Sequence, residues 1–182
     1  APSNLSFVPG NHDAYVTVPW SNGLQHLAPW MKPDKHEPQD DTLLFPYVRM
    51  RRNVALIGIN SGQPQNYLKA SGTVGEQQLR DLQHVLNMLG SQGFYRVVMI
   101  HHPPLPGLSP PRKALSDAAA LRSVLVTEGA ELVLHGHNHR EMLTMLESSS
   151  GKVPVFGVPS ASTNGDGDHE PRWRDRVPDE PG

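Results

Sequence analysis

The chain of 182 residues lacks cysteine, long apolar segments and an excess of positive charge, and each absence excludes a class of protein. Without cysteine there is neither a disulfide framework nor a zinc site built on thiolates. No apolar run approaches the roughly 18 residues of a transmembrane helix, and the start shows no signal-peptide pattern. Lys and Arg number 16 against 18 Asp and Glu, so we expect no nucleic-acid or membrane partner. We expect a cytoplasmic protein, and the sequence leaves its oligomeric state open.

The order of apolar segments predicts one α/β domain over residues 1–162. Leucines at 79, 82, 86 and 89 recur at helical spacing, and Gly90 follows them, which predicts a helix over 76–90. Further helices are predicted at 24–31 and 118–128, and strands at 5–8, 43–51, 54–59, 95–100, 131–134, 142–146 and 153–158. Residues 163–182 have a charged composition with few large apolar side chains, which predicts a mobile tail.

Histidine is abundant, with 10 residues, and three polar clusters follow predicted strands directly. Asn11, His12 and Asp13 follow the first strand, and His101 and His102 follow the strand at 95–100. A third cluster, His137 and His139, follows the strand at 131–134. Sites in α/β proteins form beyond the carboxyl ends of strands. We therefore expect these loops to meet, although they lie far apart in the sequence.

The residue types in these clusters indicate a metal site. Neutral imidazole is the commonest nitrogen ligand of first-row divalent metals, and an amide or carboxylate oxygen is a harder ligand. A mixed set of this kind suits Mn, Fe or Zn better than Ca, which prefers oxygen alone. An isolated histidine is more often a surface residue, and we keep that interpretation for the others: His26, His36, His84 and His169.

The three motifs, in their order, resemble those of the calcineurin-like metallophosphoesterase family, and their spacing resembles the bacterial class III cyclic-nucleotide phosphodiesterase branch. The motifs are Gly10-Asn11-His12-Asp13, His101-His102-Pro103-Pro104 and Gly136-His137-Asn138-His139. The resemblance implies a four-layer α/β/β/α sandwich with two mixed sheets. It also implies a centre of two divalent metals, Mn, Fe or Zn, at which a metal-activated hydroxide hydrolyses a small-molecule phosphate ester.

The resemblance assigns Asn11, His101 and His137 to one metal and His139 to the other. It assigns His12 to the substrate phosphate and to protonation of the leaving oxygen, with Asp13 orienting the His12 ring. Two further histidines are expected to position the ligands rather than to bind metal. His102 follows the ligand His101, and His135 lies two residues before the ligand His137. His102 in place of His101 as the ligand remains the alternative. A loop that could rim the substrate pocket carries two basic residues, Arg112 and Lys113.

The chain departs from the family pattern at its start. Two earlier motifs, Asp-x-His and Gly-Asp, supply carboxylate ligands in the family, and neither of them precedes Gly10-Asn11-His12-Asp13 here. We therefore expect a fragment of the fold whose N-terminal strands are missing, with an incomplete site. Neutral ligands alone do not compensate the charge of a dication, so we expect one weakly held metal. The alternative function is a non-catalytic metal-binding or interaction domain derived from this fold.

Overall fold

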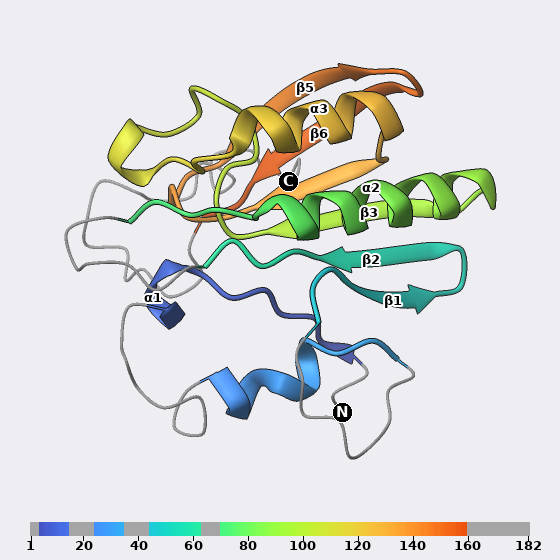
Figure 1. The fold of residues 1–182 in the computed structure, drawn as a ribbon, viewed down its shortest axis with the longest axis horizontal. Helices are drawn as coiled ribbons and strands as arrows, with labels where there is room; N and C mark the ends of the chain where they lie inside the picture. The colour runs from blue at the N-terminus through green and yellow to red at the C-terminus, as the bar shows by residue number, and fades with distance from the viewer. Residues whose placement is uncertain (1–3, 15–23, 35–43, 63–69, 160–182) are drawn as a thin grey trace, which may run out of the picture.

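The structure, a computed structural model, describes residues 4–14, 24–34, 44–62 and 70–159 (Figure 1). The predicted tail, residues 163–182, and the predicted domain boundary at residue 162 lie outside these ranges, as do His36 and His169. His26 and His84 are exposed, which confirms the surface interpretation for these two histidines. No described helix is both long enough and apolar enough to cross a membrane.

One sheet of six strands forms the centre of the molecule, in the order β1-β2-β3-β4-β6-β5. The strands β2, β3, β4 and β6 run parallel, while β1 and β5 are antiparallel at the two edges. The mixed α/β fold is confirmed. All named strands of the described residues belong to this single sheet rather than to the expected two, because the β5–β6 hairpin pairs with β4. Their bounds are β1 Tyr47–Arg51, β2 Val54–Gly58, β3 Tyr95–Ile100, β4 Leu132–His135, β5 Met142–Ser148 and β6 Gly151–Gly157.

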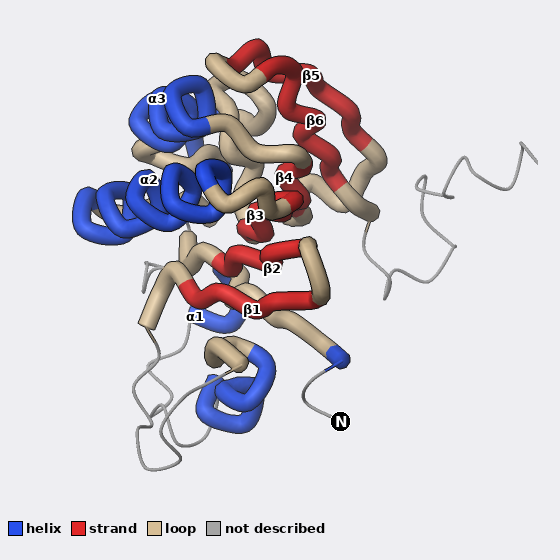
Figure 2. Tube along the Cα trace, turned by 90° about the vertical axis from the view of Figure 1, so that its right-hand side faces the viewer, coloured by secondary structure: helices blue, strands red, loops and turns tan. Residues whose placement is uncertain are grey.

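Two helices, α2 (Glu76–Ser91) and α3 (Ala118–Glu128), lie on the same side of the sheet (Figure 2). The predicted leucine stripe of α2 is buried, and α3 buries Leu121 and Leu125. These side chains meet Ile57, Val98 and Val133 of the sheet in one apolar core. Each fully buried leucine stabilises the fold by about 2 kcal/mol. The core therefore holds β2, β3 and β4 side by side, with the carboxyl ends of all three strands at the same end of the sheet.

A buried arginine at the amino end of β3 links the sheet to the helices. The Arg96 guanidinium makes two hydrogen bonds to the Glu131 carboxylate, at 3.0 and 2.8 Å. It also donates to the carbonyl oxygens of Leu86 in α2 and Glu128 in α3. Because Arg96 lies in β3 and Glu131 directly precedes β4, this one side chain joins the sheet to both helices.

The segment at 5–8 is not the strand that its apolar residues predict. It has no regular secondary structure, and the Phe7 amide donates a hydrogen bond to the Trp30 carbonyl oxygen at 3.0 Å. Side chains of β1 bind its carbonyl oxygens instead: Tyr47 donates to Phe7 at 2.8 Å, and Arg49 donates to Leu5. The two side chains of β1 thus occupy carbonyl groups that residues 5–8 would need in order to pair with a neighbouring strand. The predicted helix at 24–31 is the 3-10 helix η3 (Leu24–Trp30), with Pro29, which has no N–H to donate, inside it.

Candidate metal centre

Three of the four predicted metal ligands converge at the end of the sheet where the parallel strands have their carboxyl ends. Asn11 comes from the short helix α1 (Asn11–Ala14), His101 follows β3, and His137 follows β4. The His101 Nε2 atom lies 2.8 Å from Asn11 Oδ1 and 3.1 Å from His137 Nδ1. The His137 Nδ1 atom lies 3.2 Å from Asn11 Oδ1. We call these three atoms the donor triangle.

The size of the donor triangle fits one face of a metal coordination sphere. In an octahedral site with bonds of about 2.1 Å, adjacent ligand atoms lie about 3.0 Å apart. The sides of 2.8, 3.1 and 3.2 Å match that spacing. One amide oxygen and two imidazole nitrogens also form a donor set for first-row divalent metals. Asn11, His101 and His137 therefore fit a divalent metal, with the opposite face of the sphere left for other ligands.

His102 belongs to the histidine cluster, but its ring is already engaged. One nitrogen from each of His101, His102 and His137 falls in a group within 4.8 Å of one another. The His102 ring is fully buried, and its Nδ1 lies 2.8 Å from the Ser61 hydroxyl while its Nε2 lies 3.1 Å from the Ala70 carbonyl oxygen. The Nε2–H donates to that carbonyl, so Nδ1 accepts from Ser61. Both nitrogens are thus occupied, which favours His101 over His102 as the ligand.

The ring of His137 is presented by a tight turn with a positive φ. The Asn138 amide donates to the Gly136 carbonyl oxygen at 2.7 Å, and His137, between them, has φ 65°. This is a γ-turn of the rare, strained hand. The buried His135 ring supports the turn, because its Nδ1 lies 3.2 Å from the same Gly136 oxygen. Backbone strain at a candidate ligand is a common feature of functional sites.

Glycine plays a different part here from the one that the sequence suggests. We expect from the sequence that Gly136 allows the bend, but a Cβ at Gly136 would have 3.9 Å of room, and the positive φ falls at His137 and His139. The glycine that is needed is Gly10, because a Cβ there would lie 2.7 Å from the His101 ring. The Gly10 amide is held by the Asp13 carboxylate at 2.7 Å.

Electrostatics keeps the His137 ring neutral. Burial, together with the nearby charges of His102 and Lys113, lowers the pKa of His137 to about 4. The backbone of Lys113 acts in the opposite sense, which places it close to the ring. Burial also lowers the pKa of His102. A neutral imidazole offers the lone pair that a metal ligand requires.

The remaining predicted residues lie around the donor triangle. His139 is exposed, has φ 53°, and is near enough for its charge to act on His137. His12 lies in α1, and its side chain is outside the described part of the chain; its role and that of Asp13 toward it stay predictions. Arg112 and Lys113 are exposed in the 3-10 helix η4 (Pro111–Lys113). Ser61 was not among the predicted site residues, although Asn60-Ser61-Gly62 follows β2 as His101 and His102 follow β3.

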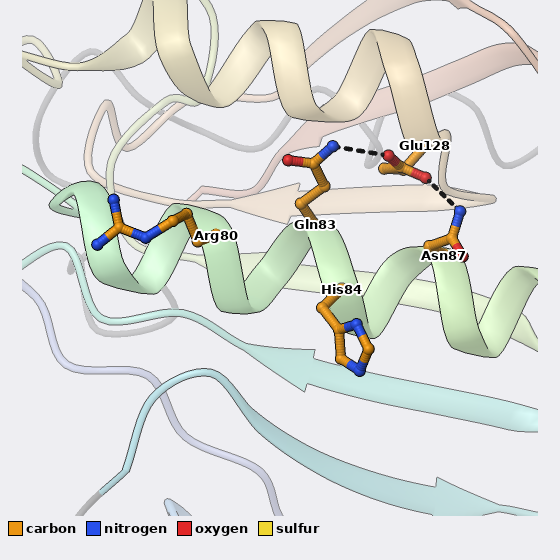
Figure 3. A pocket seen from close by; sticks show the side chains of 5 residues that line it. All are labelled: Arg80, Gln83, His84, Asn87 and Glu128. Carbon is orange, nitrogen blue, oxygen red and sulfur yellow. Dashed lines mark hydrogen bonds between the residues drawn. The ribbon is translucent and has the colours of Figure 1, made fainter.

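Side chains of α2 and the last residue of α3 line a pocket (Figure 3). The Gln83 and Asn87 amides both donate to the Glu128 carboxylate at 3.0 Å. These hydrogen bonds lower the pKa of Glu128, Asn87 having the largest effect. The Glu128 carboxylate of α3 already accepts hydrogen bonds from two side chains of α2. We therefore interpret this pocket as part of the polar packing between the two helices. The exposed His84 beside it serves below as a control position.

Comparison with known families decides what this chain is related to. A family model for calcineurin-like phosphoesterases matches residues 2–141, which include all three loops. The chain belongs to the calcineurin-like phosphoesterase family. No individual curated protein matches it. Membership supports metal-dependent hydrolysis of phosphate esters in general, and the match extends from before Asn11 to beyond His139. It does not distinguish the cyclic-nucleotide phosphodiesterase branch from the rest of the family.

Proposed function

We propose that this calcineurin-like phosphoesterase domain takes part in metal-dependent hydrolysis of small-molecule phosphate esters. The donor triangle carries the proposal, because a side-chain oxygen and two imidazole nitrogens from three separate loops lie at the spacing of metal ligands. Membership in the family supports it independently. The phosphodiesters of the cyclic-nucleotide branch and phosphomonoesters are both candidate substrates, and the cytoplasm is the proposed location.

The residues around the donor triangle have distinct proposed tasks. A divalent Mn, Fe or Zn ion, when bound, would lower the pKa of water and neutralise charge on the phosphoryl oxygens. Asn11, His101 and His137 would hold that ion, and His139 would contribute to the second ion of a complete family site. His12 contacts the phosphate and gives a proton to the leaving oxygen. Asp13 fixes the loop before α1 through the Gly10 amide, which holds the chain beside His12 in place.

The charge of the site bears on affinity and on the alternative function. Each residue of the donor triangle is neutral, and the metal-ligand group identified among the described residues contains histidines and no carboxylate. A dication in such a site lacks charge compensation, so we propose weak binding of one ion. A domain that binds metal without catalysing hydrolysis is the second candidate function, and the neutral donor set favours it.

The test is a metal-dependent assay of the protein that carries this chain. Metal-free protein receives Mn²⁺, Fe²⁺ or Zn²⁺ and is assayed with a chromogenic phosphodiester and a chromogenic phosphomonoester, with metal binding measured by calorimetry. We expect turnover that requires metal and is lost in His137→Ala, while the control His84→Ala retains it. Metal binding without turnover of either ester would establish the non-catalytic alternative. Absence of metal binding would overturn both functions.

A further inference from the structure

The loop of residues 103–113, which we call the rim loop, contacts the metal site through the backbone of Lys113 near His137 and through the side chain of Asn138. The Asn138 Nδ2 atom donates to the Leu108 carbonyl oxygen at 2.8 Å, and its Oδ1 accepts from the Ser109 hydroxyl at 2.8 Å. These partners lie 30 and 29 residues away in the sequence. The backbone amide of the same Asn138 closes the γ-turn around His137. One residue therefore connects the rim loop to the turn that presents a candidate metal ligand.

The rim loop is stiff, so a contact at its middle can set the position of its far end. It contains Pro103, Pro104 and Pro106, then Pro110 directly before η4 and Pro111 as the first residue of η4. Proline fixes φ and reduces the conformations open to a free loop. Backbone hydrogen bonds from Lys113 to Pro110 at 2.8 Å and from Ala114 to Pro111 at 3.4 Å complete the turn at its end. Movement at Ser109 is thus passed on to the basic pair that follows.

That basic pair, Arg112 and Lys113, has the chemistry that the donor triangle lacks. Both side chains are exposed, and Lys113 lies close enough to His137 for its charge to act on the ring. A phosphate ester and the phosphate released from it are anions, and arginine and lysine bind phosphate through charge-assisted hydrogen bonds.

We propose that Asn138 is a positioning residue, which with Ser109 holds the rim loop so that Arg112 and Lys113 meet the phosphate group of the substrate. The identity of the ligand rests on the proposed function. The hydrogen bonds of Asn138 to Leu108 and Ser109, which we call the tether, do not depend on that function. Asn138→Ala keeps the backbone amide of the γ-turn, so metal affinity should change by less than about threefold. Affinity for phosphate should fall, because the rim loop that carries the basic pair loses its hydrogen bonds to Asn138.

Trypsin tests the tether without reference to activity, because it cleaves after Arg112 and Lys113. Losing one hydrogen bond should raise the cleavage rate of the folded, metal-loaded protein about three- to tenfold. We expect this increase in Ser109→Ala and an increase at least as large in Asn138→Ala, which removes two hydrogen bonds. Ser109→Thr keeps a hydroxyl and should stay near the parent rate. The control is Ser116→Ala, an exposed serine just beyond the loop.

The second measurement is the affinity of the metal-loaded protein for inorganic phosphate, followed by calorimetry, together with KM where turnover is present. Ser109→Ala and Asn138→Ala should weaken phosphate binding about three- to tenfold and raise KM more than they lower kcat. Cleavage rates equal to those of the Ser116→Ala control would overturn the tether. Faster cleavage with unchanged phosphate affinity would overturn the positioning role. If the parent protein binds phosphate but catalyses no hydrolysis, the proposed function fails while the positioning role stands.

Discussion

Replacing Gly10 by alanine should remove metal binding by pushing away one corner of the donor triangle. The added Cβ would lie 2.7 Å from Cε1 and Nδ1 of the His101 ring, whereas ordinary contacts begin at 3.4 Å. The ring must therefore retreat by about 0.7 Å, while metal–ligand distances tolerate only about 0.2 Å. The donor triangle would lose His101 and keep two ligands. Changes that only disturb ligand orientation already weaken metal binding by about 10- to 100-fold, so we expect a loss of at least that size.

Gly136→Ala is the matched control, since it adds the same methyl group at another glycine beside the donor triangle. A Cβ there has its nearest neighbour at 3.9 Å, and the backbone needs no positive φ. Its dissociation constant for Mn²⁺ or Zn²⁺ should stay within about threefold of the parent value. Calorimetry on metal-free protein measures both constants, and thermal unfolding checks that both variants are folded. Equal affinity in folded Gly10→Ala and Gly136→Ala would refute the donor triangle as the metal site.

Three further predictions concern charge, catalysis and stability. Asn11→Asp puts a carboxylate into the donor triangle and should tighten Zn²⁺ binding about tenfold or more by calorimetry; unchanged affinity would show that Asn11 is not a ligand. His12→Ala should lower turnover about 100- to 10,000-fold with metal content retained by elemental analysis, and a parallel loss of metal would contradict its role as the proton donor. Burial raises the pKa of Glu131, but the hydrogen bonds and charge of Arg96 outweigh it and hold that pKa below its ordinary value of 4.5. This pair should therefore stabilise the fold above pH 4.5 and lose that effect as the pH falls through the lowered pKa, and in urea at pH 7 Glu131→Gln should cost about 2 kcal/mol with metal affinity intact, since one partner is part-exposed.

Local patterns in the sequence predicted the elements that position the site. The leucines of α2, the apolar run of β3 and the helix at 118–128 were predicted to within a residue, because burial of one face repeats with the period of the element. The prediction was wrong for 5–8, where tertiary contacts from Tyr47 and Arg49 replaced strand pairing. Periodicity reports which face is buried, but it does not report which backbone groups a distant side chain will bind.

The three motifs by themselves determined which residue types would meet, and two of them follow parallel strands of one sheet, β3 and β4. Only the tertiary structure decided their roles: Ser61 and the Ala70 carbonyl occupy the His102 ring, which leaves His101 to the donor triangle. The positive φ fell at His137 rather than at the neighbouring glycine, because a γ-turn held by Asn138 needed it there. A spacing in the sequence fixes how far apart two residues can be, whereas ligand geometry to a few tenths of an ångström depends on hydrogen bonds between loops that no local pattern records.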